Sequence, residues 1–228
     1  MKRIEQLSIE NQIECLPPET RNALRDKAGQ NLDALAASAL ENDAVLETLT
    51  ACLSEKDEVL RYNAMRALEH LAAHHPERLY PAWESLAALL DSSNGFHRAS
   101  GAALLAAVLP ADAGHRFETL FERYLNLLDD PKVMVARYLA QSIAKVALAR
   151  PDLAARITTR LLALDSTRHT PDRKVLLRGD ILEAFVQYFS QIPQTQHATM
   201  LAFAQRALDC SSPRTRKIAK KYLLNHSG

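Results

Sequence analysis

Apolar residues recur at every third or fourth position along most of the chain. In the stretch DEVLRYNAMRAL, residues 57 to 68, an apolar face runs through Leu60, Ala64 and Leu68 and continues to Leu71, with polar residues opposite. This period matches the turn of an α-helix, about 3.6 residues, and no segment alternates apolar and polar residues as a half-buried strand would. The pattern predicts an all-α protein.

An arginine-centred skeleton in this stretch recurs along the chain at intervals of 36 to 41 residues, as Arg25, Arg61, Arg98, Arg137, Arg178 and Arg216. Three residues after the arginine stand Ala28, Ala64, Gly101, Ala140, Ile181 and Ala219, which are mostly small. Seven residues after it stand the apolar Leu32, Leu68, Leu105, Ala144, Phe185 and Leu223. Since these offsets share a helix face and the interval suits a helical hairpin, the sequence predicts about six antiparallel helix pairs.

The predicted helix starts agree with this period. Three of the arginine-bearing helices open with a capping residue followed by proline, at Asp130, Thr170 and Ser212. Proline suits the first helical turn, and the preceding side-chain oxygen can accept a bond from a free amide. Asp57 and Asn94 are the corresponding capping candidates of two further helices.

Several segments resemble HEAT repeats, which are helical hairpins with an acid at the turn and an arginine early in the second helix. They are LSEKDEVLRYNAMRAL, LLDSSNGFHRASGAALL, LLDDPKVMVARYLAQSIA and, more loosely, RHTPDRKVLLRGDILEAF and CSSPRTRKIAKKYLL. The resemblance covers residues 43–226. It implies a right-handed α–α superhelix, a solenoid whose second helices line a concave surface that binds other macromolecules. Residues 1–42 fit poorly and are expected to form an atypical N-terminal cap of a single domain, 1–228.

The recurring arginines have two interpretations. Six cations in register could bind phosphates, but in solenoids of this kind the arginine more often bonds to turn acids and carbonyls of adjacent repeats. We therefore expect an internal ladder that holds successive hairpins at a constant angle.

The opposite side of the second helices, one, five and eight residues after each arginine, is the predicted binding surface. On one helix these positions are Ala99, Ala103 and Ala106, which would form a shallow apolar depression between Tyr62 and Tyr138. Arg66 and Lys145 occupy equivalent positions on the neighbouring helices. The competing interpretation is that the three alanines are simply packed against other helices.

The distribution of charge along the chain indicates what kinds of partner it could bind. The 228 residues carry a net charge of +1, but the first 114 hold 10 Lys or Arg against 17 Asp or Glu, and the rest hold 18 against 10. In an elongated fold, such ends would attract different partners, or each other in a neighbouring molecule.

The longest apolar run, residues 102–109, is too short to cross a membrane, and the acidic start lacks the core of a signal peptide. A cytoplasmic protein with three reduced cysteines is expected.

The C-terminal segment holds the densest basic cluster, with Arg214, Lys217, Lys220 and Lys221 on one predicted helix. Such a cluster can bind phosphates, or it can be the solvated face of a closing repeat. If the cluster binds phosphates, the more specific hypothesis is that the protein is a HEAT-like DNA glycosylase. That family uses tryptophans for the damaged base, and here the single Trp83 lies outside the predicted concave helices.

No motif supports catalysis. His70 and His74 share a helical face beside His75, but no third metal ligand is near in sequence, and the chain has no P-loop, GxGxxG or GxSxG. We expect no cofactor and no metal. The predicted function is a non-catalytic scaffold or adaptor that binds another protein, with nucleic-acid binding as the alternative.

Overall fold

The computed structural model describes residues 8–226, and within them every regular element is a helix. This confirms the all-α prediction. The chain falls into two compact units, Met1–His115 (unit 1) and Arg116–Gly228 (unit 2), and the single domain over residues 1–228 stays a prediction.

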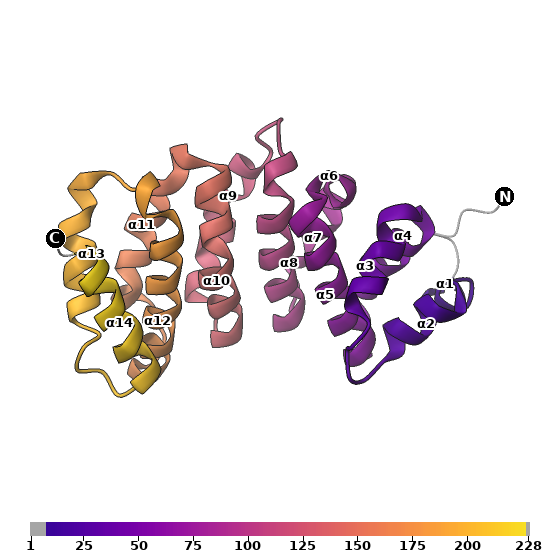
Figure 1. Cartoon of the computed structure of the whole chain (residues 1–228), viewed down its shortest axis with the longest axis horizontal. Coiled ribbons are helices and arrows are strands. Elements are labelled where there is room, and N and C mark those ends of the chain that lie inside the picture. The colour runs from indigo at the N-terminus through magenta and orange to yellow at the C-terminus, as the bar shows by residue number, and fades with distance from the viewer. Residues whose placement is uncertain (1–7, 227–228) are drawn as a thin grey trace. The chain divides into compact units, whose positions relative to one another are not determined.

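Unit 1 occupies the indigo to magenta part of Figure 1. Its helices are α1 (Ile9–Glu14), α2 (Pro18–Arg25), α3 (Leu32–Glu41), α4 (Asp43–Cys52), α5 (Glu58–His74), α6 (Pro76–Leu79), α7 (Trp83–Leu89) and α8 (Gly95–Val108). The pair α4–α5 packs against α3, and α8 packs against both α5 and α7. Two helix pairs therefore follow the N-terminal helices, α4 with α5 and α6–α7 with α8.

Unit 2 contains three pairs. Its helices are α9 (Phe117–Asn126), α10 (Val133–Ala149), α11 (Ala154–Leu162), α12 (Pro171–Tyr188), α13 (Gln194–Gln205) and α14 (Pro213–His226). The second helices of the pairs, α10, α12 and α14, lie side by side because α12 contacts both of the others (Figure 1). The described chain thus has five pairs from residue 43 onward, where the sequence predicted about six.

The missing pair is the one predicted around Arg25. Arg25 is the last residue of α2, so Ala28 and Leu32 do not share a helix with it. The helix ends there because the Asp26 carboxylate accepts the backbone N–H groups of Ala28 and Gln30, both at 2.9 Å, and Gly29 adopts a φ of 60°. These local bonds compete with the helical ones and favour a turn.

Capping side chains set the starts of α5 and α8, whereas the predicted cap Thr170 makes no capping hydrogen bond at the start of α12. Asp57 accepts the N–H groups of Val59 and Leu60, and Asn94 accepts that of Phe96, as predicted. The Asp130 carboxylate instead accepts the N–H of Lys132 within a turn, and α10 begins only at Val133. The predicted start of that helix was therefore too early.

The repeated packing positions form the core of both units. In the five pairs, the residue three positions after the arginine is always buried: Ala64, Gly101, Ala140, Ile181 and Ala219. A Cβ added at Gly101 would lie 3.0 Å from Leu89 Cβ and 3.1 Å from the Leu86 carbonyl oxygen, so a small residue lets α7 and α8 approach closely. This confirms the predicted role of the small position.

Candidate interaction surface

Three of the recurring arginines form hydrogen bonds with the turn that precedes their helix. Each donates Nη1 to the carbonyl oxygen six residues earlier: Arg61 to Glu55 at 2.8 Å, Arg98 to Ser92 at 2.7 Å, and Arg216 to Cys210 at 2.6 Å. The sequence predicted bonds to acids and carbonyls of adjacent repeats. These bonds instead lie within one helix pair, because a side chain at the second-helix start reaches its own turn first.

Arg178 uses a turn acid in the same way. It donates to Asp165 at 2.5 Å, and its guanidinium lies 4.9 Å from the centre of the Phe203 ring on α13. Arg61 similarly lies over the ring of Phe96, 4.7 Å from its centre. Both arginines are buried. Buried guanidiniums engaged by carbonyls, acids and rings are not free to bind phosphates, which supports the structural interpretation.

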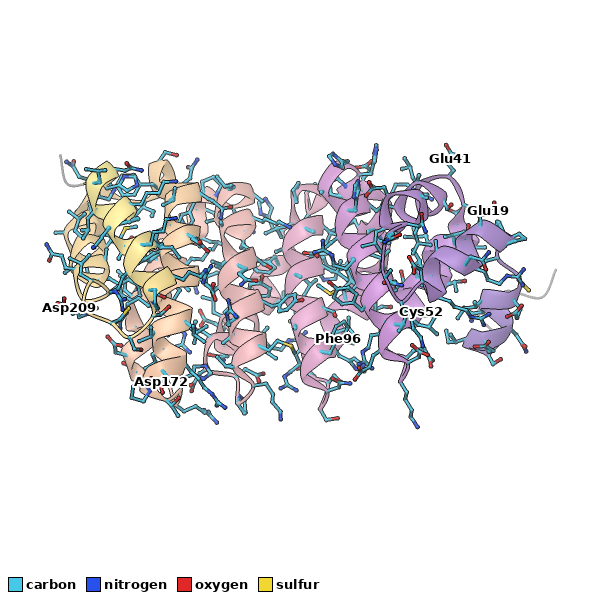
Figure 2. The ribbon with its side chains drawn as sticks, turned by 60° about the horizontal axis from the view of Figure 1, so that its bottom comes forward. Glu19, Glu41, Cys52, Phe96, Asp172 and Asp209 are labelled. Carbon is cyan, nitrogen blue, oxygen red and sulfur yellow. The ribbon has the colours of Figure 1, made fainter. Side chains whose placement is uncertain are left out.

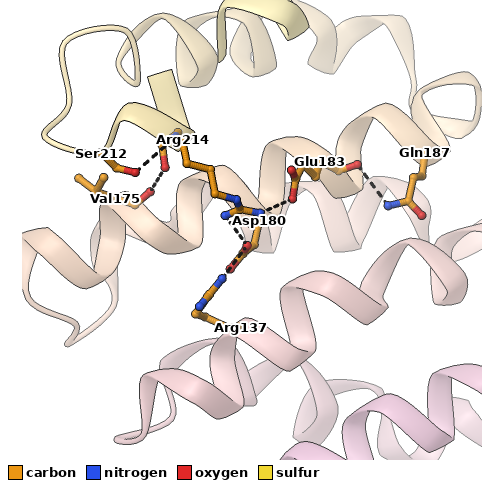
Figure 3. Close-up of polar contacts among 8 residues, drawn as sticks. Arg137, Val175, Asp180, Glu183, Gln187, Ser212 and Arg214 are labelled. Atoms are coloured by element: carbon orange, nitrogen blue, oxygen red, sulfur yellow. Dashed lines mark hydrogen bonds and ion pairs between the residues drawn. The ribbon is translucent and has the colours of Figure 1, made fainter. Parts of the chain in front are cut away.

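Arg137 is the exception, because it spans two helix pairs. Its Nε donates to Asp180 Oδ2 at 2.7 Å and its Nη2 to Oδ1 at 3.3 Å, from α10 to α12 (Figure 3). From the other side, Arg214 of α14 donates to Asp180 Oδ1 at 3.0 Å and to Glu183 at 2.6 Å. The Asp180 side chain has no exposed area, while both arginines are partly exposed. One buried carboxylate therefore holds three successive second helices together.

Electrostatics and close packing reinforce this cluster. The hydrogen bond that Arg137 donates to Asp180 raises the pKa of Arg137, and this effect exceeds the opposing effect of burial. Beside it, a Cβ added at Gly179 would lie 2.8 Å from Thr215 Oγ1, and that hydroxyl donates to the Val175 carbonyl at 3.1 Å. Glycine is thus required for α12 and α14 to approach this closely. We call Arg137, Asp180, Glu183 and Arg214 the α10–α12–α14 cluster.

Asp180 belongs to a register position that the sequence analysis missed, two residues after the recurring arginine. The equivalent residue in α5 is Asn63, which is also buried. Its amide donates to the carbonyls of Leu24 at 2.9 Å and Asp26 at 2.8 Å, at the end of α2. Polar residues occupy this buried position in three of the five pairs, at Asn63, Ser100 and Asp180, and they were the available signal, since most buried polar groups are hydrogen-bonded.

The predicted alanine depression is not open. Ala99, Ala103 and Ala106 are buried, with at most 1% of their surface exposed, and every residue from 99 to 108 is buried. The prediction was wrong because the segment ASGAALLAAV contains no charged residue, and a helix that is apolar or small all round is normally buried on every side. The competing interpretation, packed alanines, is the one the structure favours.

The other predicted partner residues remain accessible, but in separate units. Tyr62 and Arg66 are exposed on α5 of unit 1, where Arg66 lies 3.6 Å from Glu69. On α10 of unit 2, Tyr138 is half-buried and Lys145 is exposed. Unit 1 therefore offers one aromatic and one cationic side chain, and unit 2 offers another such pair.

Unit 2 also exposes a concentration of apolar side chains. Among the described residues, six large hydrophobic side chains are exposed, and four of these lie on α10 and α12: Met134, Leu148, Leu176 and Val186. On α10, the spacing from Met134 through Tyr138, Gln141 and Lys145 to Leu148 keeps all five on one helix face. Since α10 and α12 are neighbours, we call this the α10–α12 face.

Helix α14 carries the predicted basic cluster. Arg214 is bound to Asp180 and Glu183 and is thereby committed to the α10–α12–α14 cluster. Lys217, Lys220 and Lys221 are exposed and make no ion pair with other described residues. Three of the four predicted phosphate-binding residues are therefore free for an external anion.

The remaining sequence candidates are structural. Trp83, the single tryptophan, is buried in the core. His70 lies 2.9 Å from Asp33, but no group of three side chains suited to a metal ion occurs in residues 8–226. Cys52, labelled in Figure 2, is buried, and burial raises the pKa of its thiol to about 12. No helix in this described part is long and apolar enough to cross a bilayer.

Comparisons with known proteins support the fold alone. No protein-family model matches the sequence, and no curated protein matches it. Among solved structures, an engineered protein of the Northeast Structural Genomics Consortium is 21% identical, with a TM-score of 0.53 over 98% of this chain and 100% of that one. A designed armadillo repeat protein is 18% identical, with a TM-score of 0.49 over 95% of this chain and 99% of that one. The successive helix pairs within each unit and the first of these likenesses assign the chain an all-α, helical-repeat solenoid fold.

Proposed function

We propose that this chain is a non-catalytic, cytoplasmic scaffold that binds another protein, with its main contact surface on the α10–α12 face of unit 2. The observation that carries the proposal is the concentration of Met134, Leu148, Leu176 and Val186 on two neighbouring helices. Exposed apolar side chains scattered singly need no explanation, whereas several on adjoining helices are typical of protein interfaces.

The charged residues around this face suggest the chemistry of the partner. Lys145 is exposed among the apolar residues, and the guanidinium of Arg137 is partly exposed beside Asp180. We expect a partner segment with apolar side chains and at least one acidic residue. The α10–α12–α14 cluster would hold the face in one geometry before binding, which reduces the entropy lost on association.

Unit 1 would contribute a second, smaller contact. Tyr62 and Arg66 are exposed on α5, and exposed tyrosine and arginine are frequent in the energetic centres of protein interfaces. The buried Ala99, Ala103 and Ala106 take no part in this proposal.

The experiment is an affinity capture from the native cytoplasm, with the whole chain as bait and quantitative mass spectrometry as readout. Leu148→Asp and Val186→Asp place a charge in the α10–α12 face, and Leu224→Asp is the matched control on α14. A true partner should be recovered at least about tenfold less with both face variants and normally with the control. Equal recovery with all variants of unchanged helicity would contradict the assignment of this face.

Nucleic-acid binding remains the second candidate, because Lys217, Lys220 and Lys221 are exposed and unpaired within the described chain. If they contact phosphates, affinity for a fluorescent oligonucleotide should fall steeply between about 50 and 200 mM salt. Changing all three lysines to Glu should abolish it, while Lys145→Glu should not. An absence of binding to single- or double-stranded DNA and RNA at low salt would exclude this alternative.

A further inference from the structure

The two ends of the described chain carry equal and opposite charge. Residues 8–52 contain eight Asp or Glu and three Lys or Arg, a net charge of −5. Residues 194–226 contain six Lys or Arg and one Asp, a net charge of +5. Opposite charges at the two ends of one chain favour contacts between copies of that chain.

The acidic end has a groove between α2 and α3. Its volume is about 480 Å³, and two rows of residues line it, Glu19, Asn22 and Asp26 along α2 and its end, and Asn31, Leu35 and Ser38 along α3. Neighbouring residues within each row are three or four positions apart, which is the spacing of a ridge on the surface of a helix. A groove between two such ridges is shaped to receive a third helix.

Three polar side chains of this groove lack partners in the described part of the chain. The side chains of Glu19, Asn22 and Asn31 form no hydrogen bond or ion pair with other residues in the range 8–226. Glu19 lies at the N-terminal end of unit 1 (Figure 2). Below them, Ala23 and Leu35 supply apolar lining. The groove therefore offers one free carboxylate and two free amides above an apolar floor.

The basic end presents a helix face with the matching spacing. Lys220, Lys221 and Leu224 follow Lys217 by three, four and seven residues along α14, so the four residues share one face. Leu224 is 85% exposed, the highest exposure among the described large hydrophobic residues that face solvent. The lysines have no ion-pair partner in the described chain.

We propose that the exposed face of α14 docks into the α2–α3 groove of a second copy of this chain. Lysines of α14 would pair with Glu19 and bond to the carbonyl oxygens of the two amides, and Leu224 would cover the apolar floor. The contact is heterologous, because a groove on one molecule meets a different surface on the next. Each pair of molecules would keep one free groove and one free α14, so assembly could continue head to tail. This inference does not use the α10–α12 face.

Sedimentation velocity of the whole chain tests the proposal. At about 50 mM salt the chain should form species larger than a monomer as its concentration rises, and about 1 M salt should dissociate them because charges are screened within about 3 Å. Glu19→Lys, or Lys217→Glu with Lys221→Glu, should each weaken association at least about tenfold. Matched controls are Glu41→Lys and Arg173→Glu, exposed charges outside the two surfaces, which should leave the association unchanged.

A mixing experiment decides between this contact and other modes of self-association. The Glu19→Lys protein keeps a native α14, and the Lys217→Glu, Lys221→Glu protein keeps a native groove. Each should be monomeric alone, and their equimolar mixture should associate, because the native α14 of one protein meets the native groove of the other and the two charge-reversed surfaces again carry opposite charges. A monomeric wild-type chain at low salt, unimpaired association of either variant, or a mixture that stays monomeric would overturn the proposal.

Discussion

Asn63 in unit 1 and Asp180 in unit 2 occupy the same register position, yet they hold their units together by different means. Asn63 donates to two backbone carbonyls at the end of α2. Asp180 accepts from two arginines, one on the helix before and one on the helix after. An amide can be satisfied by backbone that is already in place. The buried Asp180 carboxylate is paired with cations that the neighbouring helices supply, so this register position depends on charge pairing in unit 2 and not in unit 1.

The comparison predicts that unit 2 is the more sensitive to loss of charge. The two units can be followed separately, because the chain's single tryptophan, Trp83, is buried in unit 1 and reports on it by fluorescence. Amide hydrogen exchange with mass spectrometry follows segments of unit 2.

The largest effect should come from removing both cations of the cluster. Arg137→Ala with Arg214→Ala leaves the Asp180 carboxylate buried without a positive partner, which should destabilise unit 2 by about 3 to 5 kcal/mol. Each single substitution should cost about 1 kcal/mol, because the other arginine remains. Hydrogen exchange in α10, α12 and α14 measures the loss.

A third substitution provides the control for this effect. Adding Asp180→Ala to the double variant removes the stranded charge and should recover most of the lost stability. If the double variant lost only the sum of the two single losses, Asp180 would not be the shared acceptor on which the cluster depends.

A smaller but still large effect is expected at the neutral counterpart. Asn63→Asp places a carboxylate against the carbonyls of Leu24 and Asp26, so two donated bonds become two repulsive contacts in a buried site. Unit 1 should lose about 2 to 4 kcal/mol, seen as a lower midpoint in denaturant-induced Trp83 fluorescence. Asn22→Asp, at an exposed residue of α2, is the matched control and should change the midpoint little. Tolerance of Asn63→Asp would show that the two positions are not chemically distinct.

Sequence patterns were sufficient for the repeat register but not for the contacts between repeats. The spacing of the arginines and the small residues after them predicted five of the pairs, since both follow from packing along one helix. The partners of Arg61 and Arg137 could not be predicted, because the same residue type bonds to its own turn in one helix and to the next helix in another. That choice depends on whether a neighbouring helix supplies an acid such as Asp180.

The candidate surface was predicted in part for a similar reason. Offsets from the arginine correctly place Lys145 and Lys217 on exposed faces, yet they also select Ala103, which is buried. The offsets from the arginine define which face of a helix a residue lies on, whereas its exposure depends on whether another helix packs against that face. The same offsets also select Val186, which is exposed, whereas the exposure of Leu148 could not be distinguished by sequence from that of an ordinary core position.

A moderate effect is expected where α12 meets α14. Gly179→Ala adds a Cβ 2.8 Å from Thr215 Oγ1, which forces apart two of the helices that Asp180 joins. Unit 2 should lose about 1 to 3 kcal/mol by hydrogen exchange. Thr215→Ala in the same chain should reduce this loss, because the obstructing hydroxyl is gone. A Gly179→Ala chain as stable as the wild type would show that the close approach is not what fixes α14.

The smallest expected effect is a pH dependence of unit 1, where the contact made by Asn63 is uncharged. Burial, and secondarily the nearby Arg61, lower the pKa of His97 below its ordinary value of about 6.5. The unfolded chain therefore binds a proton more readily than the folded one. The contribution of His97 to the stability of unit 1 is therefore fully present above the ordinary pKa of histidine and is lost as the pH falls through the pKa of His97 in the folded chain.

Trp83 fluorescence should accordingly show unit 1 weakening between about pH 7 and pH 5. His97→Gln should flatten that slope, because its amide does not titrate and can still bond to Ser92, which lies 3.0 Å from His97 Nδ1. His74→Gln, at an exposed histidine of the same unit, is the matched control and should leave the slope as it is. An unchanged slope in the His97→Gln chain would show that another group causes the pH dependence of unit 1. Unit 1, in which Asn63 joins α5 to the end of α2 without charge, would then owe none of its pH dependence to His97.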